Sequence, residues 1–125
     1  MINSILLYIG SCVIFIWGVA HLIPTKSVIA GLGQISEDNR RLLLMGWMAE
    51  GLTLCFIGVL VFLITLLVGP QNLASEIVTR ASYIMLALMA ALSSNTGART
   101  AMAPMKICPY VKMTVAILFL LGTIL

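Results

Sequence analysis

The sequence predicts an all-α integral membrane protein, folded as a single bundle of four antiparallel transmembrane helices. Two features of the sequence predict this class. Of the 125 residues, 62% are hydrophobic and only 9% are charged, whereas a soluble domain carries about 25% charged residues. The hydrophobic residues gather in four long runs with few charges, and a membrane-spanning helix needs about 20 such residues. The charges are therefore too few to cover a soluble globule, and the lipid bilayer is the expected partner.

The four runs define the approximate spans 2–23, 42–68, 77–95 and 109–125 of one domain, 1–125. The first run is predicted to be a retained helix rather than a cleaved signal peptide, because no basic residue precedes it. The second helix is predicted to begin before its span, near Glu37, with Ser36 as its N-cap and acidic residues in its first turn. Pro109 suits the first position of the fourth helix.

A short segment at the membrane interface is predicted between the first two helices. Apolar residues at positions 28, 29, 32 and 35 follow a helical spacing, which is typical of a short turn that lies along the interface.

The distribution of basic residues predicts the orientation of the bundle. A nucleic-acid binder would gather its basic residues into a run or patch, but the seven Lys and Arg residues are scattered along the chain. The first and third connections, with their margins, carry Lys26, Arg40, Arg41, Arg99, Lys106 and Lys112, and the opposite face carries only Arg80. Because basic loops stay in the cytoplasm, we expect both of these connections to be cytoplasmic and both termini to lie outside. We expect the membrane to be the inner membrane of a bacterium.

Glu50 is the most informative residue, because a charge inside a bilayer costs a few kcal/mol or more. It lies nine residues past Arg41, which places it about 13 Å into the membrane. Gly46 and Thr53 share its helical face, so this face should point into the bundle. Two interpretations remain open: a packing carboxylate that is protonated or hydrogen-bonded, or a functional carboxylate beside a cation or a cavity. In either case Glu50 needs a polar partner, and His21, Arg99 and Asn95 are the candidates.

The other candidate residues fall in the same, cytoplasmic half, and with Glu50 they form a candidate polar cluster. These residues are His21, Asn95, Arg99 and Cys108. His21, the single histidine, is either a hydrogen-bonded interface residue or a ligand. Cys108 precedes the predicted fourth helix and lies near Lys106, a setting that favours a reactive thiolate. No metal-binding spacing or cofactor motif is present, so neither a metal nor a particular cofactor is predicted.

Small residues recur at seven-residue spacing on the first two helices. Ser4, Ser11 and Gly18 form one seam, and Gly51, Gly58 and Thr65 form the other. Small residues let membrane helices approach closely, so both seams are predicted to be buried helix contacts.

The chain resembles the DoxX-like group of small four-helix membrane proteins. The matching stretches are Gly18-Val-Ala-His21-Leu22, Ile29-Ala-Gly-Leu-Gly33 and Glu50-Gly-Leu-Thr-Leu, with Gly58 after the last. The resemblance implies a compact antiparallel bundle. It also implies an association with membrane oxidoreductase assemblies, or a role as an assembly factor like that of distant relatives.

Two classes of function follow from these features. The first is an accessory, assembly or scaffold subunit, in a homo-oligomer or in a larger membrane complex such as a redox complex. The second is a site for small-molecule binding, redox chemistry or proton-coupled transport, centred on Glu50 in a polar pocket that faces the cytoplasm. The sequence does not decide whether the protein is an enzyme.

Overall fold

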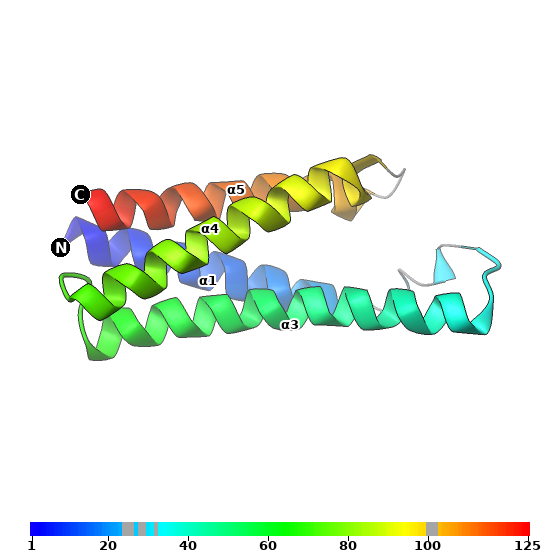
Figure 1. The fold of residues 1–125 in the computed structure, drawn as a ribbon, viewed down its shortest axis with the longest axis horizontal. Coiled ribbons are helices and arrows are strands. Elements are labelled where there is room, and N and C mark those ends of the chain that lie inside the picture. Colours follow the sequence, from blue (N-terminus) through cyan, green and yellow to red (C-terminus); the bar gives the residue numbers. More distant parts are fainter. Residues whose placement is uncertain (24–26, 28–29, 32, 100–102) are drawn as a thin grey trace.

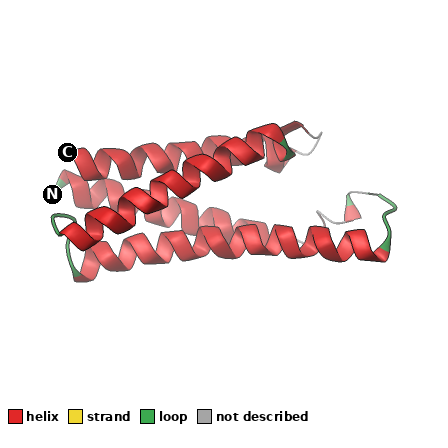
Figure 2. Ribbon diagram, in the orientation of Figure 1, coloured by secondary structure: helices red, strands yellow, loops and turns green. Residues whose placement is uncertain are grey.

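The computed structural model describes residues 1–23, 27, 30–31, 33–99 and 103–125. In this part of the chain the regular structure is helical throughout (Figure 2). The long helices are α1 (Ile2–Leu22), α3 (Glu37–Leu67), α4 (Leu73–Asn95) and α5 (Ala103–Ile124), and a 3-10 turn, η1 (Gly97–Arg99), follows α4. All four long helices are long and apolar enough to cross a membrane. The prediction of an all-α fold with four such helices is confirmed.

The helices lie side by side along one common direction (Figure 1). The two chain termini and the turn between α3 and α4 lie at one end of the bundle. The last residues of α1 and α4, together with η1, lie at the opposite end, which we call the η1 end. α1 packs mainly against α3 and α5, and α4 packs mainly against α5, whereas α3 and α4 contact each other far less. α3 is the longest helix, with 31 residues, and it extends past the others at the η1 end (Figure 1).

Side-chain caps fix where α3 and α4 begin. The Ser36 side chain accepts a hydrogen bond from the Asn39 backbone N–H at 3.2 Å, and Glu37 and Asp38 occupy the first turn of α3. The predicted start of this helix is therefore confirmed. Asn72 caps α4 in the same manner, and its side chain accepts a hydrogen bond from the Ala74 backbone N–H at 2.8 Å.

The start of α5 differs from the prediction. The helix begins at Ala103 and Pro109 lies inside it, so the prediction that Pro109 takes the first helical position is wrong. Cys108 therefore lies in the second turn of α5 and not before the helix. Pro109 is the seventh residue of α5, beyond the first four N–H groups that lack an acceptor within the helix, so it removes one donor from the interior of the helix.

The contact between α1 and α3 is built on glycine. A Cβ atom at Gly18 would lie 2.8 Å from both the Gly51 carbonyl oxygen and the Cys55 backbone nitrogen, and one at Gly58 would lie 2.8 Å from the Ser11 carbonyl oxygen. Gly18, Gly51 and Gly58 are buried where the two backbones meet. The two predicted seams of small residues therefore meet each other inside the chain.

The centre of the bundle is apolar, and so is most of its surface. Leu7, Ile14, Leu54, Val61 and Phe119 are among the residues that form the core. Large apolar side chains also cover the outside of every long helix. Contiguous apolar surface of this extent is unusual on a soluble monomer and suits contact with lipid.

The predicted interfacial segment falls largely outside the described residues. Positions 28, 29 and 32 are not described. Ile35 is half-buried and lies directly before the cap of α3.

Candidate functional site

A group of polar side chains meets inside the bundle near the η1 end. α1 contributes His21, α3 contributes Glu50, α4 contributes Ser93, and α5 contributes Cys108 and Lys112. We call these five residues the polar cluster. Four separate helices are needed to assemble it, so its formation depends on the packing of the whole bundle.

Lys112 links the α3 and α4 sides of the polar cluster. Its ammonium group forms an ion pair with Glu50 Oε1 and donates a hydrogen bond to Ser93 Oγ at 2.6 Å. The Lys112 side chain has no exposed surface, whereas 27% of the Glu50 side chain is exposed. The sequence placed Lys112 with the basic residues at the margin of the third connection, but its side chain is buried inside the bundle. Because α5 begins at Ala103, Lys112 lies about 13 Å along the helix, on the face that it shares with buried Cys108.

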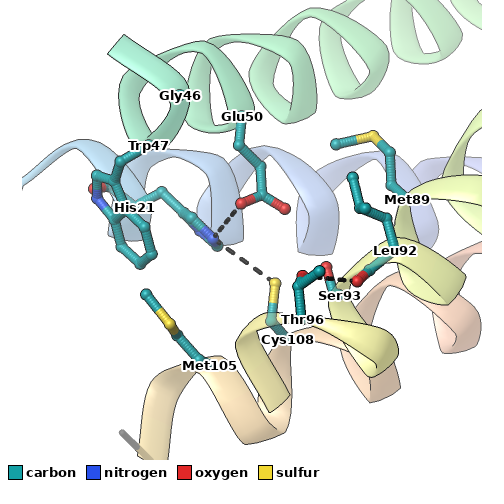
Figure 3. Close-up of a pocket in the computed structure, with 10 residues that line it drawn as sticks. All are labelled: His21, Gly46, Trp47, Glu50, Met89, Leu92, Ser93, Thr96, Met105 and Cys108. Atoms are coloured by element: carbon teal, nitrogen blue, oxygen red, sulfur yellow. Dashed lines mark hydrogen bonds and ion pairs between the residues drawn. The ribbon is translucent and has the colours of Figure 1, made fainter. Parts of the chain in front are cut away.

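His21 lies between Glu50 and Cys108. Its Nε2 atom is 3.7 Å from Glu50 Oε2 and 3.6 Å from Cys108 Sγ (Figure 3). Its Nδ1 atom is 3.0 Å from the carbonyl oxygen of Trp17. A carbonyl oxygen only accepts hydrogen bonds, so in the neutral imidazole the proton is placed on Nδ1. Nε2 is then the acceptor for the Cys108 thiol, and it pairs with the Glu50 carboxylate when the imidazole is protonated.

The two tryptophans of the chain surround His21. Trp17 Nε1 donates a hydrogen bond to Cys108 Sγ at 3.4 Å, and Trp47 Nε1 donates one to the His21 carbonyl oxygen. The His21 ring lies 4.7 Å from the Trp47 ring and 5.6 Å from the Trp17 ring, measured between centroids. These contacts hold the imidazole in one orientation.

A pocket of about 290 Å³ opens beside the polar cluster. Glu50, His21 and Cys108 supply polar atoms to it, whereas Met89, Leu92 and other apolar groups supply most of its wall. The complete lining is His21, Gly46, Trp47, Glu50, Met89, Leu92, Ser93, Thr96, Met105 and Cys108 (Figure 3). A mostly apolar wall with a few converging polar groups is typical of small-molecule sites, and the volume lies at the small end of their range.

The structure brings together three of the five candidate residues predicted from the sequence. His21, Glu50 and Cys108 place one ligand atom each within 4.8 Å of one another. Asn95 is exposed, and its side chain donates a hydrogen bond to the Ala91 carbonyl oxygen at 3.0 Å. Arg99 is exposed in η1. Among the described residues, neither of these two lines the pocket.

The predicted polar partner of Glu50 exists. His21 was one of the three candidates, and it contacts Glu50. The cation that pairs with Glu50 is Lys112. The prediction of Arg99 as this cation is not borne out by the contacts of the described residues.

The sequence interpretation missed four residues of the site and its support: Trp17, Trp47, Ser93 and Lys112. Trp17 lies four residues before His21, and Lys112 lies four residues after Cys108. Residues at this spacing share a helical face. The spacing could therefore have placed Trp17 and Lys112 beside the two candidates. Trp47 lies three residues before Glu50, so the same reasoning could have placed it beside that candidate, whereas no comparable signal marks Ser93.

Comparisons of the chain with models of protein families, with curated proteins and with solved structures find no match. The functional assignment therefore depends on the geometry of the site. The DoxX-like resemblance stays a prediction.

Proposed function

We propose that this protein is an integral membrane protein that binds a small molecule in the pocket beside the polar cluster. In this proposal the four helices cross the bilayer in alternating directions, and the η1 end faces the cytoplasm of a bacterium. One observation carries the proposal: four helices converge to place His21, Glu50, Cys108 and Lys112 beside one pocket, whereas the other buried side chains of the described residues are uncharged.

The cost of the polar cluster supports a functional role. Removing two charged groups from water costs several kcal/mol each, and their attraction repays this only with good geometry and further hydrogen bonds. A well-packed apolar pair in the place of Glu50 and Lys112 would hold the helices together at least as well. Ionisable residues inside membrane proteins mark functional sites for this reason.

The one-sided position of the polar cluster favours binding over conduction. A proton relay would need ionisable groups along the length of the bundle. Among the described residues, the buried polar side chains beyond the polar cluster are all uncharged: Asn3, Ser11, Thr65, Ser75, Thr79 and Ser82. Most of them donate hydrogen bonds to backbone carbonyls, as Ser11, Thr65 and Ser82 do within their own helices. We therefore place a binding site, open from one end, ahead of a carrier.

The role of an accessory subunit takes second place. The seams of small residues were one of the sequence arguments for it. Gly18, Gly51 and Gly58 are used in the contact of α1 with α3, so they do not indicate a second chain. Membership of a membrane redox complex, as the DoxX-like resemblance implies, stays a prediction.

The test is the reactivity of Cys108 toward N-ethylmaleimide in membranes. The test uses a variant with Cys12→Ala and Cys55→Ala, in which Cys108 is the remaining thiol. Because Cys108 lines the pocket, we expect it to react, and to react at least several-fold more slowly when Gly46→Leu fills the mouth of the pocket. A chain with Cys108→Ala and Lys106→Cys, at an exposed position, gives the rate of an open thiol. A Cys108 that does not react while Cys at position 106 does would contradict the proposal.

A further inference from the structure

We infer that His21 Nε2, Glu50 Oε2 and Cys108 Sγ form a binding site for a divalent transition-metal ion of the zinc class. The inference rests on the proposed function, because the ion would lie at the polar wall of the same pocket. It specifies the ligand atoms at the wall of the pocket: one nitrogen, one oxygen and one sulfur.

The spacing of the three atoms fits such an ion. Zinc binds His nitrogen, carboxylate oxygen and Cys sulfur at about 2.0, 2.1 and 2.3 Å, and a tetrahedral ion holds these atoms roughly 3.3–3.6 Å apart. His21 Nε2 lies 3.6 Å from Cys108 Sγ and 3.7 Å from Glu50 Oε2. All three atoms lie within 4.8 Å of one another. A bound ion would draw the Glu50 carboxylate toward Cys108 Sγ.

Each ligand also has the supporting contact that metal ligands have in proteins. A metal-binding His donates its other ring N–H to a carbonyl or carboxylate, which orients the ring. His21 Nδ1 faces the Trp17 carbonyl oxygen in this way at 3.0 Å. Trp17 Nε1 donates to Cys108 Sγ, and Lys112 holds Glu50 Oε1, so that Oε2 is the oxygen that faces His21. Trp17 and Lys112 are therefore positioning residues for this site.

Binding of the ion leaves the site with one surplus positive charge. Cys108 binds as a thiolate, so its thiol proton leaves to solvent through the pocket as the sulfur–metal bond replaces a metal-bound water. The thiolate and the Glu50 carboxylate then carry two negative charges against the two positive charges of the ion, and Lys112 supplies one further positive charge. The surplus positive charge favours an anionic group in the fourth position.

The fourth position would open toward the pocket, because all three ligand residues line it. Structural zinc sites are closed by four protein ligands, whereas catalytic sites keep three protein ligands and leave one position for water or substrate. Among the described residues, the ligand group consists of these three side chains. The site therefore has the composition of a reactive centre, and the pocket wall of Met89 and Leu92 would contact the apolar part of the bound molecule.

Cobalt is the probe for this site, because a thiolate bound to Co²⁺ gives a charge-transfer absorption in the near ultraviolet. We would titrate Co²⁺ into the purified full chain with Cys12→Ala and Cys55→Ala, carrying no histidine tag. We expect an absorption that saturates at one Co²⁺ per chain and is removed by excess Zn²⁺. The absorption should vanish with Cys108→Ala, and the affinity for Co²⁺ should fall at least tenfold with His21→Ala or Glu50→Ala.

Two further variants separate a built site from an adventitious one. Trp17→Phe keeps the ring but removes the N–H group that reaches Cys108, and we expect the Co²⁺ affinity to fall by about tenfold, as for other supporting residues of metal sites. Arg99→Ala, outside the cluster, should leave the affinity unchanged. Circular dichroism identifies any variant that fails to fold, and a rise of Tm with Zn²⁺ in the parent chain, absent with Cys108→Ala, gives a second readout.

The outcomes distinguish this inference from the proposed function. A missing Co²⁺ band, or one that survives Cys108→Ala, overturns the metal site while a reactive Cys108 still supports the pocket. A Cys108 that N-ethylmaleimide does not reach, in a chain that binds no Co²⁺, overturns both.

Discussion

Lys112 is a charged residue that is fully buried in a mostly apolar helix. Its ammonium group is held there by Glu50 and Ser93. A lysine in this position cannot reach water with its ammonium group, so its charge depends on the carboxylate. Glu50 in turn has Lys112 on one oxygen and His21 near the other. The three side chains therefore act as one unit, and a change in one of them alters the environment of the others.

Replacement of Glu50 by glutamine tests this dependence. Glu50→Gln keeps the shape of the side chain but leaves Lys112 buried without a counter-charge. We expect the free energy of unfolding in detergent to fall by about 3 kcal/mol, the lower end of the cost of breaking a buried ion pair. The lower end applies because 27% of the Glu50 side chain is exposed. Denaturant titration followed by circular dichroism measures this change.

Arg99→Gln is the matched control for Glu50→Gln. Arg99 is exposed in η1, and we expect its loss to change the stability by less than about 0.5 kcal/mol. Equal losses for the two variants would show that buried Lys112 does not depend on Glu50.

At the residue scale, the sequence predicted the need of Glu50 for a partner but not the identity of that partner. The need follows from the depth of Glu50 in its apolar run, which the sequence contains. The identity depended on where α5 begins. With Pro109 as the first helical residue, Lys112 falls in the first turn and reaches the interface. With the observed start at Ala103, it lies more than two turns inside.

At the scale of elements, the α1–α3 contact depends on the absence of side chains at three glycines. An added Cβ at Gly18 would meet backbone atoms of α3 at 2.8 Å, and backbone cannot move aside as a flexible side chain can. We expect Gly18→Ala to separate the two helices and to destabilise the bundle by about 1–3 kcal/mol. The midpoint of thermal unfolding in detergent measures the effect.

Gly46→Ala provides the comparison on the same pair of helices. No atom lies within 4 Å of a Cβ at Gly46. Alanine is the better helix former by about 1 kcal/mol, so we expect unchanged or raised stability. Equal effects of Gly18→Ala and Gly46→Ala on stability would contradict the close approach of α1 and α3 at Gly18.

The helices themselves were largely predictable from the sequence. Long apolar runs marked all four, and the seven-residue spacing of Ser11 and Gly18 against Gly51 and Gly58 marked the face at which two of them meet. The Ser36 cap was predictable because a hydroxyl before two acidic residues is a local signal. The start of α5 was not, since Pro109 suits the first position of a helix but lies inside α5.

At the scale of the whole molecule, the polar cluster and most basic residues lie toward the η1 end. Because Lys112 is buried in α5 and belongs to the polar cluster, it no longer counts among the basic residues of the loops. Five basic residues, Lys26, Arg40, Arg41, Arg99 and Lys106, still stand against Arg80 alone. Arg80 also pairs with Glu76. The remaining bias continues to favour a cytoplasmic η1 end.

Labelling of intact cells tests this orientation. In a chain without its native cysteines, we expect a membrane-impermeant maleimide to label Gln71→Cys, in the turn between α3 and α4, and not Gln34→Cys, before α3. Both positions are exposed, so a difference in labelling reports the side of the membrane. Labelling at position 34 and not at position 71 would contradict the predicted orientation and indicate the opposite one.

Composition was enough to predict the fold class, because a chain with 9% charged residues has few alternatives to a membrane bundle. The pocket was not predictable in the same way. Its lining comes from all four helices, so it depends on their rotation and on where α3 and α4 separate. The sequence could indicate that His21, Glu50 and Cys108 lie at a similar depth, but only the packing brings them within 4.8 Å.

The central claim is that the polar cluster serves the pocket rather than the stability of the bundle. The most direct test compares the unfolding of Glu50→Leu, Lys112→Met and the double variant in the same detergent. Each single change leaves a charged group without its partner, and we expect a loss of about 3 kcal/mol from each. The double variant replaces the ion pair by apolar groups of similar size, so its stability should return to within about 1 kcal/mol of the parent chain. A double variant that loses the sum of the two single losses would contradict the account, because the pair would then be holding the fold together.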